Sequence, residues 1–432
     1  MRFLSTRGGV APTGLSAALA AGLAPDGGLF VPERVPRLDP AGFPEDASLA
    51  ATAAHLLAPF FEGDPLAGAL DAVCAEAFAI AAPLRPLRGA GDFVLELFHG
   101  PTAAFKDFGA RFLAACLERM PRDPARPLTV LVATSGDTGA AVAGAFHGRE
   151  GMRVLILYPE GRVSPRQAQG LEAWGGNVRA LRVAGSFDDC QRMVKAALAD
   201  PALRARHPLG SANSISLGRW LPQAAYYAHA ALGHWRTTGR PLGFVVPTGN
   251  LGNALAALLA RRMGLPVGDI VLACNANRVL PDFFAGGAYV PVPSVATLAN
   301  AMDVGAPSNF ERLCWLEPDV DALRAALRAV PVDDAAIRDA LRAAPARHGL
   351  VACPHTACAL HALDAARAAG EGGDRAVVAT AHPAKFESIV EPLVGHAVPV
   401  PPALAALLAR PAQGMRVGTG ADVIPAALDA AT

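Results

Sequence analysis

The sequence predicts an α/β fold built on open, mostly parallel sheets. The strongest indication is a set of continuous apolar runs of strand length, at 127–134, 152–159, 243–248, 269–275 and 376–380. Helix-like runs such as 140–146 and 254–264 lie between them, and Gly264 closes the second. Strands that are apolar on both faces and alternate with helices are typical of a parallel sheet covered on both sides.

The remaining segments differ in composition from this alternating region. Residues 1–90 contain Pro and Gly breaks and Ala-rich helical stretches with few strand signals, which predicts an N-terminal accessory domain. Residues 399–432 are rich in Ala and Pro, which predicts a helical C-terminal tail. Between them we expect a large α/β domain of residues 91–120 and 206–398, and a smaller α/β domain of residues 121–205.

Charge and cysteine usage exclude several classes of partner. Lys and Arg total 38, as do Asp and Glu, so no positive field is available to hold nucleic acid. No apolar run is long enough to cross a bilayer, and no compact apolar block follows a basic start as in a signal peptide. Seven cysteines without a CxxC pair argue against disulfides and a metal site. We therefore expect a soluble cytoplasmic protein without nucleic-acid, membrane or metal partners.

Lysine occurs only at positions 106, 195 and 385, and arginine supplies every other basic residue. Arginine stays protonated and cannot form an imine, so a position that must supply a neutral amine has to keep lysine. Lys106 lies between two phenylalanines, where desolvation would lower its pKa. The alternative is an ion pair with the adjacent Asp107. Lys195 is expected on the solvated face of a helix. Lys385 is the alternative to Lys106 as the lysine that forms an imine.

The loop PTGNLGN (247–253) joins a predicted strand to a predicted helix. Gly249 and Gly252 allow a ligand to approach the backbone closely, and the N–H groups at a helix start form a seat for a phosphate. The side chains that can add donors there are those of Thr248, Asn250 and Asn253. The alternative is an ordinary turn capped by Asn253. No GxGxxG or GxxxxGK[ST] pattern occurs at this loop, which disfavours dinucleotides and nucleoside triphosphates.

A second strand-to-helix junction, TSGDTG (134–139), is rich in hydroxyl groups. Thr134, Ser135 and Thr138 at a helix start suit a substrate carboxylate or phosphate, while Asp137 can act simply as a helix cap. Thr380, at the end of another predicted strand, can donate a hydrogen bond to a ring nitrogen. An amine, a phosphate seat and an anion pocket on one parallel sheet are what pyridoxal phosphate needs.

These segments resemble threonine synthase, a family of fold-type II pyridoxal-phosphate enzymes. The matching segments, in the family's order, are HGPTAAFKDFG (99–109), SGDTG (135–139), YPEGRVSPRQ (158–167), FDDC (187–190), ANSISLGR (212–219), PTGNLGN (247–253), AMDVGAPSNFER (301–312), PHTA (354–357) and TAHPAKF (380–386). The segment TGLSAALAAGLAPDGGLFVPE resembles the accessory domain of the longer, enteric and fungal type. The resemblance extends over nearly the whole chain.

The resemblance implies a fold-type II enzyme whose large domain binds pyridoxal 5'-phosphate as a Schiff base on Lys106, which is also the main proton shuttle. The implied cofactor contacts are Asp137, Gly249, Asn250, Leu251, Gly252, Asn253 and Thr380. The implied substrate contacts are Thr134, Ser135, Gly136, Thr138, Asn213, Ser214 and Arg219. Lys385 is implied either as a second ligand of the substrate phosphate or as a member of an ion pair.

Three positions depart from the family's pattern. Asp137 aligns with an Asn that contacts the cofactor's phenolic oxygen in shorter relatives, and a carboxylate there would repel this oxygen unless it were protonated. Leu251 replaces the more usual Phe of the phosphate loop. Cys353 stands where an acidic residue is more typical.

The implied reaction converts O-phospho-L-homoserine and water to L-threonine and phosphate, and the implied oligomeric state is a monomer. Two alternatives stay open. One is a phospho-lyase on the same scaffold that releases 2-oxobutyrate and ammonia. The other is a non-catalytic protein that binds pyridoxal phosphate or a phosphometabolite, against which the presence of Lys106 and Arg219 argues.

Overall fold

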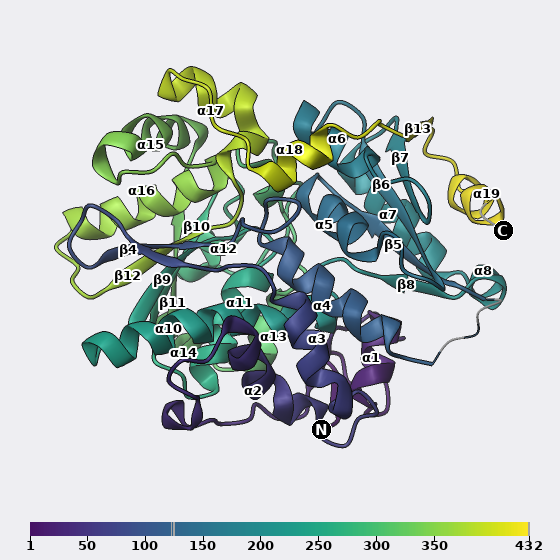
Figure 1. Cartoon of the computed structure of the whole chain (residues 1–432), viewed down its shortest axis with the longest axis horizontal. Coiled ribbons are helices and arrows are strands. Elements are labelled where there is room, and N and C mark those ends of the chain that lie inside the picture. The colour runs from purple at the N-terminus through teal and green to yellow at the C-terminus, as the bar shows by residue number, and fades with distance from the viewer. Residues whose placement is uncertain (122, 124–125, 431–432) are drawn as a thin grey trace.

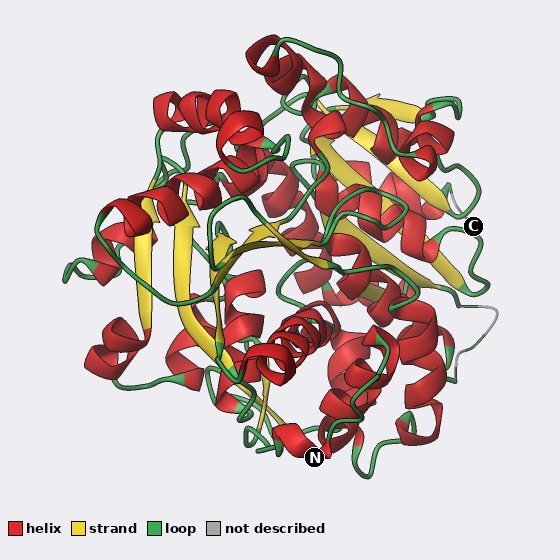
Figure 2. Cartoon of the chain, turned by 60° about the vertical axis from the view of Figure 1, so that its left-hand side comes forward, coloured by secondary structure: helices red, strands yellow, loops and turns green. Residues whose placement is uncertain are grey.

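The computed structural model describes residues 1–121, 123 and 126–430. Figure 1 shows two α/β units side by side, one on a six-stranded sheet and one on a five-stranded sheet, with the N-terminal helices packed against them. Figure 2 shows helices surrounding the strands of both sheets. Within these residue ranges, no helix combines the length and the apolar character needed to span a membrane.

The larger sheet is parallel apart from one edge strand. Its strands, in spatial order, are β11 (Leu327–Pro331), β10 (Val267–Cys274), β9 (Leu242–Pro247), β12 (Arg375–Ala379), β4 (Asp92–Glu96) and β3 (Leu84–Pro86). Only β3 pairs antiparallel, to β4. Every residue of the central strands β9 and β12 is buried, which explains why their sequences are apolar without alternation.

The smaller sheet is parallel throughout. Its strands, in spatial order, are β13 (Gly414–Val417), β7 (Val178–Val183), β6 (Met152–Pro159), β5 (Leu128–Ala133) and β8 (Leu209–Ser211). Only part of β7 is buried, and its sequence VRALRV contains two arginines. This mixed pattern explains why β7 was not among the predicted strands.

Helices cover both faces of each sheet. Around the larger sheet lie α4 (Lys106–Glu118), α9 (Leu217–Trp220), η3 (Leu221–Gln223), α10 (Ala224–Thr238), α11 (Gly252–Arg262), α12 (Val279–Phe284), η4 (Asn300–Met302), α13 (Phe310–Leu316), α14 (Val320–Ala326), α15 (Asp334–Arg347), α16 (Pro354–Ala368), η5 (Pro383–Phe386) and α17 (Glu387–Val394). Around the smaller sheet lie α5 (Asp137–Phe146), α6 (Pro165–Glu172), α7 (Phe187–Ala199), α8 (Pro201–Arg206), α18 (Pro402–Leu408) and α19 (Val423–Asp429). Ser164 and Ser186 begin α6 and α7 with capping boxes, which satisfy backbone donors at the two helix starts.

The N-terminal segment packs directly on the larger unit. It forms β1 (Phe3–Ser5) and β2 (Phe30–Pro32), an antiparallel pair, together with α1 (Leu15–Ala21), η1 (Pro40–Gly42), α2 (Leu49–Phe61), η2 (Ala67–Ala69) and α3 (Leu70–Ala77). Helix α2 contacts α10, and α3 contacts α4. Its buried residues belong to the same apolar cluster as those of α4, α10 and α11. The N-terminal segment therefore shares a core with the larger unit.

The predicted α/β class and parallel sheets are confirmed, because the five apolar runs correspond to β5, β6, β9, β10 and β12. The expected helical C-terminal tail contains α18 and α19, but it also contains the strand β13, which pairs with β7. Figure 1 shows the chain crossing from α17 to the smaller sheet through α18. A strand of four residues carries too little periodicity to be predicted, and its position depends on a free sheet edge. The domain boundaries stay predictions.

Arg312 is a fully buried cation that connects the N-terminal segment to the rest of the molecule. Its guanidinium donates hydrogen bonds to the carbonyl of Phe30 at 3.1 Å and to that of Ile215 at 2.6 Å, and it lies over the Trp220 ring. Burial lowers the pKa of Arg312 to about 9. The charge is thus compensated by backbone oxygens, which ties β2 to the segment after β8.

We expect Arg312→Met to destabilise the fold by about 3 kcal/mol, because several buried carbonyls lose a charged donor. Urea denaturation followed by circular dichroism measures the effect. The control is Arg278→Met, which removes an exposed arginine paired with Asp282 four residues away, at 2.9 Å. Such a pair contributes about 0.5 kcal/mol at most. Equal effects of the two substitutions would contradict this interpretation of Arg312.

Candidate active site

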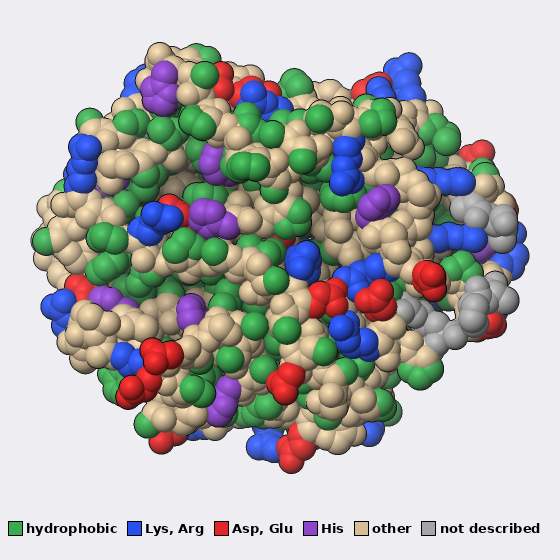
Figure 3. Space-filling model, in the orientation of Figure 1, with side chains coloured by type: hydrophobic (Ala, Val, Ile, Leu, Met, Phe, Trp, Pro, Cys, Tyr) green, Lys and Arg blue, Asp and Glu red, His purple; other side chains and the backbone are tan. Residues whose placement is uncertain are grey.

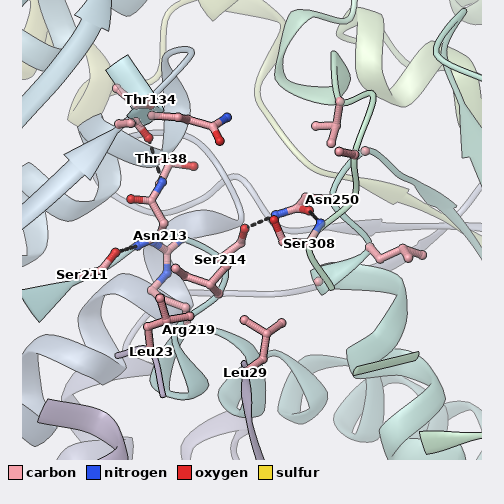
Figure 4. A pocket seen from close by; sticks show the side chains of 18 of the residues that line it. Leu23, Leu29, Thr134, Thr138, Ser211, Asn213, Ser214, Arg219, Asn250 and Ser308 are labelled. Atoms are coloured by element: carbon pink, nitrogen blue, oxygen red, sulfur yellow. Dashed lines mark hydrogen bonds between the residues drawn. The ribbon is translucent and has the colours of Figure 1, made fainter. Parts of the chain in front are cut away.

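A cavity of about 790 Å³ lies where the carboxyl ends of the two sheets face each other. Among the predicted site residues, those that line it are Lys106, Thr134, Ser135, Asp137, Thr138, Asn213, Ser214, Arg219, Gly249, Asn250, Leu251, Gly252, Asn253 and Thr380. Figure 4 shows Thr134 and Thr138 on one side and Asn250 and Ser308 on the other. Gly136 and Lys385 are not among the described residues that line the cavity.

Adjacency of strands brings the first group of residues together. Strands β9, β12 and β4 are neighbours and run in the same direction, so the segments that follow them emerge at one edge. The Phe105 N–H donates to the Thr380 carbonyl at 2.9 Å, which places Thr380 beside the start of α4. Lys106 is the first residue of α4, and Ala103 just before it has a φ of 52°. A positive φ at a non-glycine residue is a strain typical of functional sites.

Lys106 is half-buried, and its side chain lines the cavity. Burial lowers the pKa of Lys106 to about 8, an effect that Asp137 opposes and that Arg219 and Lys385 reinforce. The alternative of an ion pair with Asp107 is not observed among the described residues. Asp107 instead accepts hydrogen bonds from Thr102, from its N–H at 2.9 Å and its hydroxyl at 2.6 Å. The Lys106 amine is therefore available for chemistry near neutral pH.

The loop before α11 has the geometry of an anion seat. A Cβ on Gly249 would lie 2.7 Å from the Cα of Met302, so only glycine allows this close approach of two backbones. Leu251 has a φ of 65° and precedes the first residue of α11, an eleven-residue helix. Asn253 Nδ2 is buried without a partner in the described part of the chain, while its Oδ1 accepts from two tyrosines. An unpartnered buried donor at a helix start fits a bound phosphate.

Asn250 uses its side chain to hold three loops together rather than to face a ligand. Its Nδ2 donates to the Ser214 hydroxyl at 2.5 Å, and its Oδ1 accepts from the Ser308 N–H at 2.5 Å. Figure 4 shows both hydrogen bonds. Its backbone carbonyl accepts from Asn309 at 3.0 Å. Only the backbone N–H of Asn250 is thus expected to bind a phosphate.

On the opposite wall, the hydroxyl-rich loop starts α5. The Thr134 hydroxyl accepts from the N–H groups of Gly136 and Gly139, each at 3.0 Å, so it stabilises the loop rather than a ligand. Gly136 has a φ of 134°, which favours glycine. The hydroxyls of Ser135 and Thr138 line the cavity and are only partly buried.

Arg219 supplies a buried positive charge close to these loops. Its side chain is 2% exposed, and one terminal nitrogen donates to the Ala212 carbonyl. Its Nε has no partner within the described residues. A Cβ on Gly109 would lie 2.7 Å from the Arg219 carbonyl, so this glycine lets α4 pack closely on α9. Burial lowers the pKa of Arg219 to about 10, but the group stays charged at neutral pH and suits an anion.

Lys385 and Asp137 form an ion pair at 2.7 Å. The sequence left two roles open for Lys385, and this geometry is that of the ion-pair former. Burial raises the pKa of Asp137, but the ammonium groups of Lys385 and Lys106 outweigh it and hold that pKa well below its usual range. Asp137 is therefore ionised, which argues against the protonated form considered from the sequence.

Several residues of the site were not predicted. His355 lines the cavity, and its Nε2 accepts from the Ala301 N–H at 3.1 Å. Burial lowers the pKa of His355 to about 4, so the ring is neutral. Its PHTA segment was among the resembling motifs, which is the signal that could have found it. Leu23 and Leu29 of the N-terminal segment also line the cavity, for which the sequence contains no local signal.

Sequence profiles and solved structures relate this chain to known proteins. A sequence profile described as pyridoxal-phosphate dependent enzyme matches residues 82–383. Profiles for the threonine synthase N terminus and the threonine synthase C-terminal region match residues 2–78 and 356–424. Threonine synthase of Haemophilus influenzae is 39% identical over 396 residues, which cover 90% of this chain and 90% of that protein. The chain belongs to the threonine synthase family.

Solved structures of the threonine synthase family share the whole fold. The structure of threonine synthase from Escherichia coli matches with a TM-score of 0.91 and 34% identity, and the match covers 100% of both chains. That of pyridoxal-phosphate-bound threonine synthase from Brucella melitensis matches with a TM-score of 0.90 and 33% identity, covering 99% and 98%. The predicted family, the fold-type II class and the dependence on pyridoxal 5'-phosphate are confirmed.

We expect Gly249→Ala to weaken cofactor binding at least about tenfold, or 1.4 kcal/mol, because the added Cβ displaces the loop from Met302. Equilibrium titration of the cofactor-free protein with pyridoxal 5'-phosphate measures the change. Gly233→Ala is the control, since a Cβ there meets nothing within 4 Å. Unchanged affinity in Gly249→Ala would show that the close backbone contact is not needed.

The low pKa of Lys106 predicts how cofactor capture depends on pH. Only the neutral amine attacks an aldehyde, so the capture rate of the cofactor-free protein should rise with pH through a midpoint near the pKa of about 8. Stopped-flow absorbance at a series of pH values measures it. A midpoint near 10, where an ordinary lysine titrates, would contradict the burial of this amine.

Proposed function

We propose that this chain converts O-phospho-L-homoserine and water to L-threonine and phosphate, with Lys106 as the residue that binds the cofactor. The observation that supports this most directly is the arrangement around the cavity. Lys106, Thr380 and the loop 249–253 follow adjacent strands of one sheet, opposite the hydroxyl-rich loop of the other. Family membership supports the same reaction.

The proposed cofactor contacts follow from the chemistry of each group. The Lys106 amine would hold the aldehyde carbon, and the backbone of 249–253 with Asn253 would hold the phosphate. The Thr380 hydroxyl would meet the ring nitrogen without protonating it, because threonine is a far weaker acid than Asp. When bound, the cofactor's ring delocalises the electron pair left on the substrate's α-carbon after proton removal.

Lys106 is the proposed acid and base of the reaction. A pKa of about 8 lets the amine accept a proton from the substrate's Cα, and then from Cβ, and return it near neutral pH. The phosphate group leaves from Cγ with the electron pair of the C–O bond. The two protons taken from Cα and Cβ are returned to Cγ, which becomes the methyl group, and to Cα. Water supplies the hydroxyl at Cβ, and its remaining proton goes to the released phosphate.

Substrate anions have two proposed positions. Ser135 and Thr138, with the N–H groups at the start of α5, suit the α-carboxylate. Arg219, with Asn213 and Ser214, suits the dianionic phosphate. Asn213 is fixed there because its Nδ2 donates to the Ala133 carbonyl at 2.7 Å. These residues orient the substrate between the two sheets and keep its leaving group next to a positive charge.

We further infer a monomeric enzyme of the cytoplasm that acts on a small molecule and has no nucleic-acid partner. All seven cysteines are free thiols, as is typical of a reducing compartment. Basic and acidic side chains are interspersed on the face in Figure 3, in keeping with a net charge of zero. Size-exclusion chromatography with light scattering tests the oligomeric state.

Lys106→Ala is expected to abolish threonine formation and the visible absorbance of the bound cofactor. Borohydride reduction of the unmodified enzyme, followed by peptide mass spectrometry, should locate the adduct at Lys106. Lys195→Ala, at an exposed position, is the control for the adduct's location.

Product analysis separates the alternatives. Threonine and phosphate in equal amounts would support the proposal. If 2-oxobutyrate and ammonia were the main products, the chain would be a phospho-lyase. If no substrate were converted, it would be a binding protein. An adduct at Lys385 would contradict the role of Lys106.

A further inference from the structure

The Asp137–Lys385 pair lies at the wall of the cavity. The two side chains are 5% and 4% exposed, and the Lys385 ammonium also donates to the Thr102 carbonyl at 2.8 Å. Asp137 lines the cavity, whereas Lys385 is not among the described lining residues. The ammonium of Lys385 is therefore bonded to the protein and does not face the space for substrate.

The two oxygens of Asp137 differ in their surroundings. Oδ1 accepts from Lys385 at 2.7 Å and from Gln167 Nε2 at 3.2 Å. Both of these contacts are made to the same oxygen of the carboxylate. Asp137 is thus held by one oxygen, and the other is free to interact with a group in the cavity.

The pair also connects the two α/β units next to Lys106. Asp137 begins α5 on the smaller unit, and Lys385 belongs to η5, which follows β12 of the larger sheet. Thr102, which accepts from Lys385, donates to Asp107 beside the reactive lysine. The Ser164 hydroxyl at the start of α6 donates to the Lys385 carbonyl at 3.0 Å, which fixes η5 against the smaller unit.

Lysine suits this position better than arginine, which dominates elsewhere in the chain. The acceptors around the ammonium are one carboxylate oxygen and one carbonyl, and three ammonium protons can serve them with one left over. A guanidinium has five donors in a rigid planar arrangement, most of which would stay buried and unsatisfied. Arginine, which supplies most basic residues of this chain, is therefore a poor substitute for lysine at position 385.

We propose that Lys385 is a positioning residue that holds the Asp137 carboxylate by one oxygen, so that the other oxygen is the counter-ion of the Lys106 nitrogen. This inference rests on the proposed function, because it takes Lys106 as the reactive amine. It assigns Lys385 no contact with the substrate phosphate. The group that Asp137 recognises is a nitrogen cation, either the free ammonium or the protonated nitrogen that joins Lys106 to the cofactor.

The charged and titratable groups facing Lys106 come from four elements. Asp137 on α5 raises the pKa of Lys106, while Arg219 on α9 and Lys385 on η5 lower it, in addition to the larger effect of burial. His355 on α16 is neutral near pH 7, since burial lowers its pKa to about 4. Because Asp137 and Lys385 act in opposite directions, removing either charge alone must change the pKa of Lys106 in a predictable sense.

The test measures the protonation of Lys106 in the full-length chain. In the cofactor-free form, competitive acylation with acetic anhydride at a series of pH values, with mass spectrometry of the peptide containing residue 106, measures the pKa. In the holoenzyme, pH titration of the cofactor's visible absorbance gives the second measurement.

Asp137→Asn should lower the Lys106 pKa and raise its acylation at pH 7 severalfold. Lys385→Met should raise the Lys106 pKa, and each tenfold increase in proton affinity should slow acylation about tenfold. In the double variant, the Lys106 pKa should return close to its value in the unmodified chain. The absorbance midpoint should move in the same directions.

Arg182→Met is the matched control. It breaks an ion pair with Glu172, a carboxylate that is 5% exposed and does not belong to the described cavity wall. It should change stability without moving the Lys106 pKa. If Lys385→Met does not fold, Asp137→Asn still decides the question, because it keeps an oxygen acceptor for the ammonium. A pKa change of the wrong sign, or none, overturns the proposal.

Inhibition by inorganic phosphate separates positioning from substrate binding. A positioning role predicts that Lys385→Met changes the inhibition constant less than about twofold, while Arg219→Met weakens it more than tenfold. A loss in Lys385→Met as large as in Arg219→Met would overturn the inference. If the adduct lies at Lys106 and the variants leave its pKa unchanged, the inference alone fails. An adduct elsewhere refutes the proposed function, whatever the acylation shows.

Discussion

The carboxyl ends of parallel strands lie at one edge of a sheet, and the site depends on this geometric constraint. Strands β4, β9 and β12 are adjacent, so the segments that follow them, which are far apart in the sequence, meet at one edge. Strands β5 and β8 do the same in the other sheet. The cavity between these edges receives a reactive amine from one unit and hydroxyl groups from the other.

Burial of charge then determines what each group can do. A buried charge is costly unless it is paired, and three cations around the cavity meet this cost in different ways. Lys385 pairs with Asp137, and Arg219 donates to a backbone carbonyl. Lys106 has no such partner in the described structure, and burial lowers its pKa to about 8. The cavity therefore has an excess of positive charge over its one buried carboxylate, which suits a substrate with a carboxylate and a phosphate.

Backbone strain is concentrated at the same place. Among the described residues, only Ala103 and Leu251 have a positive φ without being glycine. One precedes the reactive lysine, and the other precedes the helix of the proposed phosphate seat. Such conformations persist only where surrounding packing enforces them. Here the enforcing contacts include the hydrogen bond from Phe105 to Thr380 and the close contact of Gly249 with Met302.

The sequence by itself determined the fold class and the main strands, because burial on both faces leaves a continuous apolar run. It also indicated the loop of the proposed phosphate seat, because a tight loop requires glycine. Lysine occurs at only three positions, and arginine cannot form an imine, so local chemistry also drew attention to Lys106. Only the tertiary structure decided that Lys385 pairs with Asp137, that Asn250 ties loops together, and that β13 completes a sheet. Such partnerships join distant segments, and periodicity within a segment contains no information about which distant group will lie beside it.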